Sequence, residues 1–351
     1  MLRFKQFIIL TEGGNVTVEY QGKRVGADPI DLHQRSRKQV TSGIRGFLSA
    51  LHDEIHNISG EHLFGKNKVA LSKGTTFGGS TRPLMDQKIS DDVFINKMGK
   101  NKVGDIDTLV KPEHIQPGGP LDRALQPGKK YNKFTVIGRT NIGTSLHAIV
   151  RNDGTGDHHQ IDFAGVPYEG NHPSMFSQVA YGSHPDDMMV GLKGADHTTL
   201  LTSAIKAAEM FEGNVVAKSG KNKGKITEQG PLPRRTFSIA YGMRPSHREL
   251  GGGLAEKINP AKTPIHYTTD LKEISRQTFG VPNGELDSFH GVARTMKKYF
   301  NHRQIADTIR LTRKSMEETP EAASRLPKAM GVLHQFFGDT HPDLFPELKR
   351  K

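Results

Sequence analysis

The sequence predicts an α/β protein of the α+β type, in which a β-sheet is flanked by helices and followed by a helical C-terminal region. Two observations predict this fold class. Apolar residues recur at helical spacing between residues 40 and 58, and again from about residue 285 onward. Between these regions, short apolar runs bounded by turn residues are typical of strands. The 351 residues are enough for two domains, each with its own core.

The composition favours some kinds of partner and excludes some kinds of site. The formal net charge is +12, which makes a polyanion such as nucleic acid or nucleotide phosphate a reasonable partner. The chain has no cysteine, which excludes disulfides, thiolate zinc sites and a cysteine nucleophile. No apolar run approaches the roughly 20 residues that a membrane span needs, so we expect no membrane partner.

The N-terminal part is predicted to be helical. Residues 1–12 form a short amphipathic segment that stops at Gly13 and Gly14. From Val40 a long helix should bury one apolar face, and we assign residues 13–66 to an N-terminal helical region. The apolar positions of that face are Val40, Ile44, Phe47, Leu51, Ile55 and Ile58.

The central region, residues 67–245, should contain the sheet. A polar, poorly periodic insertion from Ser80 to Gly104 precedes a strand in KVGDIDTLV, Lys102–Val110. Further strands are expected at 134–138, 145–150 and 160–166. A helix with Leu201, Ala204, Ala208 and Phe211 on one face should then end at Gly213, followed by an exposed loop over 214–235 and a short strand over 237–242.

Residues 246–351 are predicted to be mainly helical. Apolar residues at helical spacing form two stripes, one on each of two expected helices, and the outer faces of these helices are basic. A solvated surface is the first interpretation of these faces, and a nucleic-acid contact is the alternative. The basic residues are Arg294, Lys297, Lys298, Arg310, Arg313 and Lys314.

Two aspartates interrupt the strand Lys102–Val110. Since side chains alternate along a strand, Asp105 and Asp107 share one face, while Ile106 lies on the other. Like charges at this spacing repel unless a cation lies between them. The pair therefore indicates either an acidic edge strand or a divalent-metal site.

Two more features favour the metal site. FGGSTRP, Phe77–Pro83, ends a strand with small residues and can expose backbone N–H groups to phosphate oxygens. Asp162 is a lone carboxylate in an apolar strand, and that strand could pair with the one carrying Asp105 and Asp107.

Taken in this order, the motifs resemble the DNA polymerase β superfamily of nucleotidyltransferases. The matching residues are Phe77, Gly79 and Ser80, then Gly104, Asp105, Ile106 and Asp107, and finally Asp162. The segment between Ser80 and Asp105 is longer than usual for that superfamily, so an insertion must loop out. VGDIDTLV also resembles predicted nucleotidyltransferases of large contractile-tailed phages. The resemblance implies a mixed, largely antiparallel sheet with flanking helices in a catalytic domain over 67–245.

The resemblance also implies a reaction, the transfer of a nucleotidyl group from an NTP with release of pyrophosphate. Asp105 and Asp107 would bridge two Mg²⁺ ions, with Mn²⁺ as a substitute, and Asp162 would hold one of them. Gly79, Ser80, Arg82 and Lys193 would contact the phosphates of the nucleotide. The acceptor stays open among protein, RNA and small molecule, as does the base preference.

The phage resemblance suggests a location in the host cytoplasm, with packaging in the virion head as an alternative. The segment from Phe7 to Glu12 resembles targeting peptides that are cleaved after a Leu-x-Glu sequence, here Leu10 to Glu12. A packaged or nucleic-acid-binding protein without catalysis is therefore a second hypothesis.

Two further hypotheses each conflict with a feature of the sequence. DIDTL resembles the first motif of haloacid-dehalogenase-type phosphatases, but these need an apolar strand running directly into the first aspartate. Zinc binding by the histidines lacks a pair at helical i, i+4 spacing. The histidines concerned are His158, His159, His172, His184 and His197.

Overall fold

The computed structural model describes residues 16–142, 145–217, 220–238, 242–258 and 267–346. The chain divides into two compact units, Met1–Met189 and Val190–Lys351. This division falls inside the region 67–245 that we expected to be one domain. The candidate targeting segment 1–12 and the pair Gly13-Gly14 lie outside the described residues.

A five-stranded sheet forms the centre of the first unit, with strand order β5-β9-β8-β7-β6. The parallel pair β5–β9 stands at one edge, and the other neighbouring strands are antiparallel. The expected mixed, largely antiparallel sheet is thus confirmed. Its strands are β5 (Asp105–Val110), β6 (Lys130–Tyr131), β7 (Phe134–Ile142), β8 (Ser145–Asn152) and β9 (His158–Gly165).

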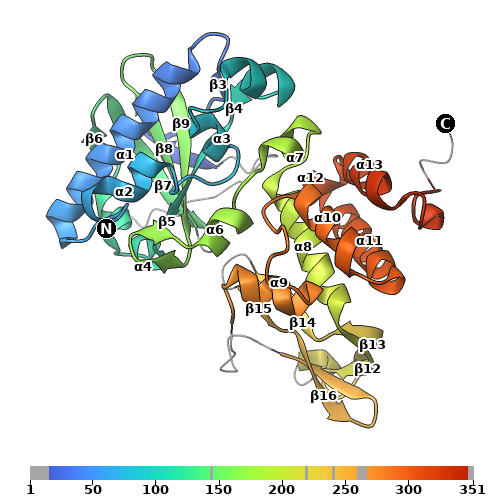
Figure 1. The fold of residues 1–351 in the computed structure, drawn as a ribbon. Coiled ribbons are helices and arrows are strands. Elements are labelled where there is room, and N and C mark those ends of the chain that lie inside the picture. Colours follow the sequence, from blue (N-terminus) through green and yellow to red (C-terminus); the bar gives the residue numbers. More distant parts are fainter. Residues whose placement is uncertain (1–15, 143–144, 218–219, 239–241, 259–266, 347–351) are drawn as a thin grey trace. The chain divides into compact units, whose positions relative to one another are not determined.

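Helix α1 (Arg37–Ser59) covers one face of this sheet, as Figure 1 shows. Its start is fixed by a capping box in which Ser36 accepts from the N–H of Gln39, and it ends at Gly60, which adopts a left-handed conformation. The buried face of α1 matches the predicted periodicity. It packs against inward-facing strand residues in one continuous core that includes Phe47, Leu51, Ile55, Val136, Ala148, Ile161 and Phe163.

On the opposite face of the sheet, the described residues form two small apolar clusters. One joins Ile137 and Ile149 to Val16 and Val18 of the β-hairpin β1 (Thr17–Tyr20) and β2 (Lys23–Gly26). A Cβ at Gly138 would lie 2.8 Å from Val18 Cγ2, so glycine permits this close packing. The other cluster contains Leu109, Ala164 and Val166. Polar residues of β5, β8 and β9 lie between the two clusters.

The expected polar insertion 80–104 is packed rather than loose. It contains α3 (Thr81–Met85), the π-helix η2 (Val93–Lys97) and β4 (Lys102–Val103), which pairs with β3 (Ile30–Asp31). Five of its apolar side chains join the main core, and their spacing has no regular period because they are spread over α3, η2, β4 and the residue that ends η2. They are Leu84, Met85, Phe94, Met98 and Val103.

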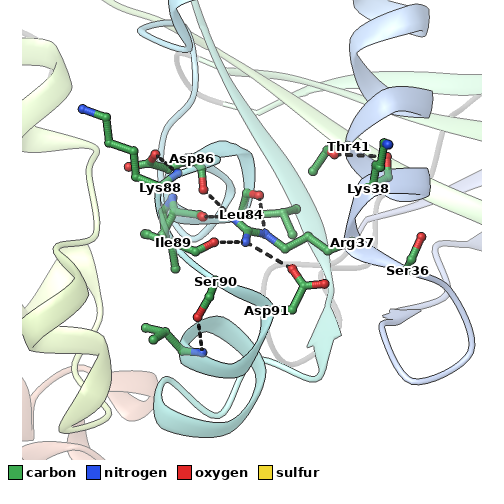
Figure 2. A network of polar contacts seen from close by, with 12 residues as sticks. Ser36, Arg37, Lys38, Thr41, Leu84, Asp86, Lys88, Ile89, Ser90 and Asp91 are labelled. Atoms are coloured by element: carbon green, nitrogen blue, oxygen red, sulfur yellow. Dashed lines mark hydrogen bonds and ion pairs between the residues drawn. The ribbon is translucent and has the colours of Figure 1, made fainter.

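Arg37 of α1 holds this segment in place (Figure 2). Its buried guanidinium donates to the carbonyls of Leu84 at 2.8 Å, Pro83 at 2.9 Å and Asp86, and it also contacts Ile89 O and Asp91. A rigid guanidinium can satisfy several carbonyls that a turn leaves unpaired. The backbone after α3 is therefore fixed to α1.

The first unit is completed by short elements that connect these parts. They are η1 (Lys66–Lys68), α2 (Val69–Lys73), α4 (Pro112–Ile115), α5 (Pro120–Ala124), β10 (Tyr168–Glu169), β11 (His172–Pro173), α6 (Met175–Ala180) and α7 (Pro185–Met189). The region 13–66, expected to be helical, also contains β1, β2 and β3.

The second unit begins with α8 (Gly194–Ala208) and contains a four-stranded sheet of order β13-β12-β17-β16. Two predictions were wrong here. The helix ends at Ala208, and Phe211 lies in strand β12. The expected loop 214–235 is largely a β-hairpin of β12 (Met210–Val216) and β13 (Ile226–Pro233), because cross-strand pairing stabilises residues whose own sequence is rich in lysine, glycine and proline.

The remaining strands of this unit are short. They are β14 (Arg235–Ser238) and β15 (Gly242–Pro245), which form a hairpin, and β16 (His247–Gly251) and β17 (Leu254–Lys257), with the 3-10 turn η3 (Gly220–Asn222). The region 246–351, predicted to be mainly helical, begins with the strands β16 and β17 and is helical from residue 271. Its helices are α9 (Leu271–Phe279), α10 (Phe289–Tyr299), α11 (His302–Glu317), α12 (Pro320–Ala323), α13 (Leu326–Phe337) and the turn η4 (Pro342–Leu344).

A buried ion pair connects α8 to the start of α13, where Arg325 donates to both oxygens of Asp196 at 2.7 and 2.9 Å. Several of the basic residues predicted on the outer faces have partners within the unit. Arg294 pairs with Glu285, and Arg310 pairs with Asp307. These pairs agree with the first interpretation, a solvated charged surface.

Candidate metal centre

Three carboxylates meet on the partly open face of the five-stranded sheet. Asp105 and Asp107 lie on β5, and Asp162 lies on β9 directly opposite Asp107 in the parallel register. One oxygen of each side chain lies within 4.8 Å of the others. Neighbouring strands in register place equivalent side chains on the same face, so the predicted convergence of these aspartates is confirmed.

The electrostatics of this arrangement favour a cation. All three carboxylates are half-buried, and their mutual repulsion is screened less than it would be in water. Carboxylate oxygens are hard ligands of the kind that Mg²⁺ and Mn²⁺ prefer. The three side chains therefore fit a divalent metal in both charge and ligand type.

Two side chains that the sequence analysis missed hold Asp162. His147 of β8 lies 2.8 Å through Nδ1 from Asp162 Oδ1, and Gln160 Nε2 donates to the two carboxylate oxygens at 2.9 and 3.0 Å. Gln160 is fully buried, and its Oε1 accepts from the N–H of Val16 at 2.8 Å. Such partners fix the orientation of a ligating carboxylate.

Part of this arrangement was visible in the sequence. Gln160 and Asp162 are two residues apart, so strand alternation puts them on one face. His147 could not be found in this way, because it reaches Asp162 only through the pairing of β8 with β9.

Gly79 lies directly against Asp107. A Cβ at this position would be 1.9 Å from Asp107 Oδ2, and the φ angle of 45° also favours glycine. The Gly79 N–H donates to the carbonyl of Tyr181, and the Gly78 N–H donates to the carbonyl of Asp107. Gly79 thus contributes close backbone approach to the carboxylate, and its amide is already bonded within the protein.

Residues Ser80 and Thr81 begin helix α3 beside the aspartates. Ser80 is half-buried, and its carbonyl accepts from the N–H of Leu84. Thr81 Oγ1 accepts from the N–H of Asp107 at 2.9 Å. This contact, which sequence reasoning missed, connects the glycine-rich segment to β5.

The two basic residues predicted to contact phosphate are in different places. Arg82 donates to the carbonyl of Gln178 at 3.1 Å and lines a cavity in the first unit. Lys193 belongs to the second unit, where it precedes α8 and its N–H donates to Asp196 Oδ2 at 2.8 Å.

Tyr168 packs against the apolar cluster that contains Leu109 of β5 and Ala164 of β9. Its hydroxyl donates to the carbonyl of Leu109 at 2.9 Å, and burial raises the pKa of this phenol. The hydroxyl therefore remains a donor at neutral pH and holds the chain that follows β9 against β5.

The described residues contain no second group of three or more His, Asp or Glu side chains that could hold a metal ion. The zinc hypothesis for the histidines thus gains no support there. In the same part of the chain, no helix is long and apolar enough to cross a membrane.

Comparison with known proteins finds no matching family, no similar curated protein and no similar solved structure.

Proposed function

We propose that this protein is a nucleotidyltransferase that transfers an NMP group from an NTP to an acceptor and releases pyrophosphate. The observation that supports this most is the convergence of Asp105, Asp107 and Asp162 on two neighbouring strands. The glycine-rich segment packed against Asp107 is the second support, because the same order of motifs led to the nucleotidyltransferase resemblance.

In this proposal, Asp105, Asp107 and Asp162 would hold Mg²⁺, which would supply charge neutralisation on the phosphates and lower the pKa of the attacking hydroxyl. His147 and Gln160 keep Asp162 oriented, and Gly79 leaves room for the Asp107 carboxylate. The protein's own contribution is then positioning and electrostatic stabilisation.

The phosphatase alternative gains no support from the strands. Asp105 is the first residue of β5, and the preceding strand β4 consists only of Lys102 and Val103, paired elsewhere with β3. No apolar strand runs into the first aspartate, as that chemistry would need.

The proposal is tested by incubating the protein with each of the four α-labelled NTPs, Mg²⁺ and a bacterial lysate, and by following the label. We expect label from at least one NTP on a protein, RNA or small molecule, with Mn²⁺ able to replace Mg²⁺. Absence of transfer from all four, with a folded protein, would contradict the proposal.

Asp107→Asn should reduce transfer by about a thousandfold or more, because the metal contribution is several kcal/mol. Its melting temperature should equal or exceed that of the unchanged protein, since one of three repelling carboxylates is neutralised. Asp92→Asn is the matched control, because Asp92 is exposed and its hydrogen bond from Asn96 can be kept by an amide. Unfolding of Asp107→Asn would instead assign the pair a structural role.

A further inference from the structure

A cavity of about 460 Å³ in the first unit is lined by four cationic side chains. Arg45 comes from α1, Lys73 from the end of α2, Arg82 from α3, and Lys88 from the segment held by Arg37. Asp86 is the one carboxylate that lines it. We call this the basic cavity, and none of Asp105, Asp107 and Asp162 lines it.

The cations of the basic cavity are not neutralised within the part of the chain that the structure describes. Arg45 donates to the carbonyls of Leu71 at 3.0 Å and Met85 at 3.3 Å, and Arg82 donates to the carbonyl of Gln178. None of the four makes an ion pair with a described carboxylate. Asp86 uses Oδ1 to accept from the backbone N–H of Lys88 at 2.9 Å.

Arg45 is the most buried of these four cations. Its guanidinium is half-buried, lies 5.7 Å from the centre of the Phe77 ring, and has its pKa lowered by desolvation. The carbonyl dipoles offset only part of the free-energy cost of desolvating this guanidinium, because a buried cation is best stabilised by an anion. An anionic ligand in the cavity would supply the missing charge.

The wall of the basic cavity is also fixed in advance. Arg37 binds the carbonyls of residues on both sides of Gln87 and Lys88, so this segment keeps its shape without a ligand. Figure 2 shows the Lys88 side chain extending away from Arg37, on the other side of the segment. A binding site built on a constrained backbone loses less entropy when its ligand binds.

We propose that the basic cavity is an anion site, separate from the metal centre, that binds the phosphate group of a small phosphorylated molecule. Arginine and lysine are the residues that recognise phosphate oxygens, and arginine can do so with two parallel hydrogen bonds. The volume exceeds what one phosphate fills and lies in the range of small-molecule sites, so the ligand carries more than the phosphate. The inference does not depend on the nucleotidyltransferase proposal.

The test uses inorganic pyrophosphate as the probe, with EDTA present so that no metal is available, and measures binding by calorimetry. The double variant Lys73→Gln/Lys88→Gln should weaken binding by about tenfold, because two exposed cations of the cavity are removed. The matched control is Lys66→Gln/Lys97→Gln, which makes the same charge change at exposed positions outside the cavity. The control should bind pyrophosphate like the unchanged protein.

A further variant separates the basic cavity from the metal centre. Asp107→Asn should bind pyrophosphate in EDTA as the unchanged protein does. If binding needed the aspartates or the metal, or if both lysine double variants lost affinity equally, the separate anion site would be ruled out.

A second arm identifies the source of the phosphate by comparing AMP, adenosine and single-stranded RNAs of increasing length. AMP should bind in EDTA and adenosine should not, and Lys73→Gln/Lys88→Gln should weaken AMP binding. Affinity that rises with RNA length, with no binding of AMP, would overturn the proposal in favour of a polynucleotide surface.

Discussion

On the face of the five-stranded sheet that lies under α1, Phe47 belongs to the same buried core as the strand residues Ile161 and Phe163. On the opposite face, the same strand β9 carries Gln160 and Asp162, which face Asp105 and Asp107 of β5. One strand thus supplies both a core and a candidate site. Because successive side chains of a strand point to opposite faces, the residues that form the core are different from those that form the candidate site.

Truncation on the packed face should have the largest effect on stability. Phe47 is fully buried and meets Tyr131 and Phe134 edge to face, at ring distances of 5.6 and 5.7 Å. Phe47→Ala should lower the free energy of unfolding by about 3–5 kcal/mol, measured by urea denaturation. An equal decrease in the free energy of unfolding of Asp107→Asn would contradict this difference between the two faces.

On the acidic face, the closest packing is between Gly79 and Asp107. Gly79→Ala should push the Asp107 carboxylate aside and weaken Mn²⁺ binding by about 10- to 100-fold, measured by titration. Gly99→Ala is the control for backbone strain, because Gly99 also has a positive φ of 65° but has no atom within 4 Å of an added Cβ. Equal metal affinity in the two variants would show that the contact at Gly79 does not position Asp107.

The support given to Asp162 can be tested at His147. His147→Gln should leave Asp162 less well oriented and reduce Mn²⁺ affinity by about tenfold, with little change in unfolding free energy. The exposed His33, changed to Gln, provides the control. A large loss of stability with unchanged metal affinity would assign His147 to the core instead.

The smallest effect should appear as a pH dependence on the packed side. His52 of α1 is buried, its Nδ1 accepts from the N–H of Phe64 at 3.2 Å, and burial lowers its pKa from 6.5 to about 4. Below pH 6.5 the unfolded chain binds a proton that the folded protein does not, so stability falls as the pH drops toward 4.

This contribution should amount to about 1 kcal/mol between pH 6 and pH 5. His52→Gln should flatten the difference between urea unfolding curves recorded at these two pH values. His56→Gln, an exposed change on the same helix, should not. An unchanged slope in His52→Gln would place the acid sensitivity elsewhere.

The sequence by itself determined the features that depend on local geometry. Apolar spacing predicts the buried face of α1, and alternation in β5 predicts that Asp105 and Asp107 share a face. The order of the glycine-rich segment and the three aspartates also selected the residues that converge. These properties are set by helical and strand periodicity, which neighbouring residues alone specify.

The tertiary structure decided everything that depends on which distant segments pair. The register of β9 between β5 and β8 brings Asp162 opposite Asp107 and adds His147, while the pairing of β12 with β13 turns an expected loop into a hairpin. The cations of the basic cavity come from α1, α2, α3 and the segment after α3, and no local pattern connects them. Such contacts arise from burial and hydrogen bonding between remote parts of the chain, because periodicity fixes the face on which a residue lies but not the partner it meets.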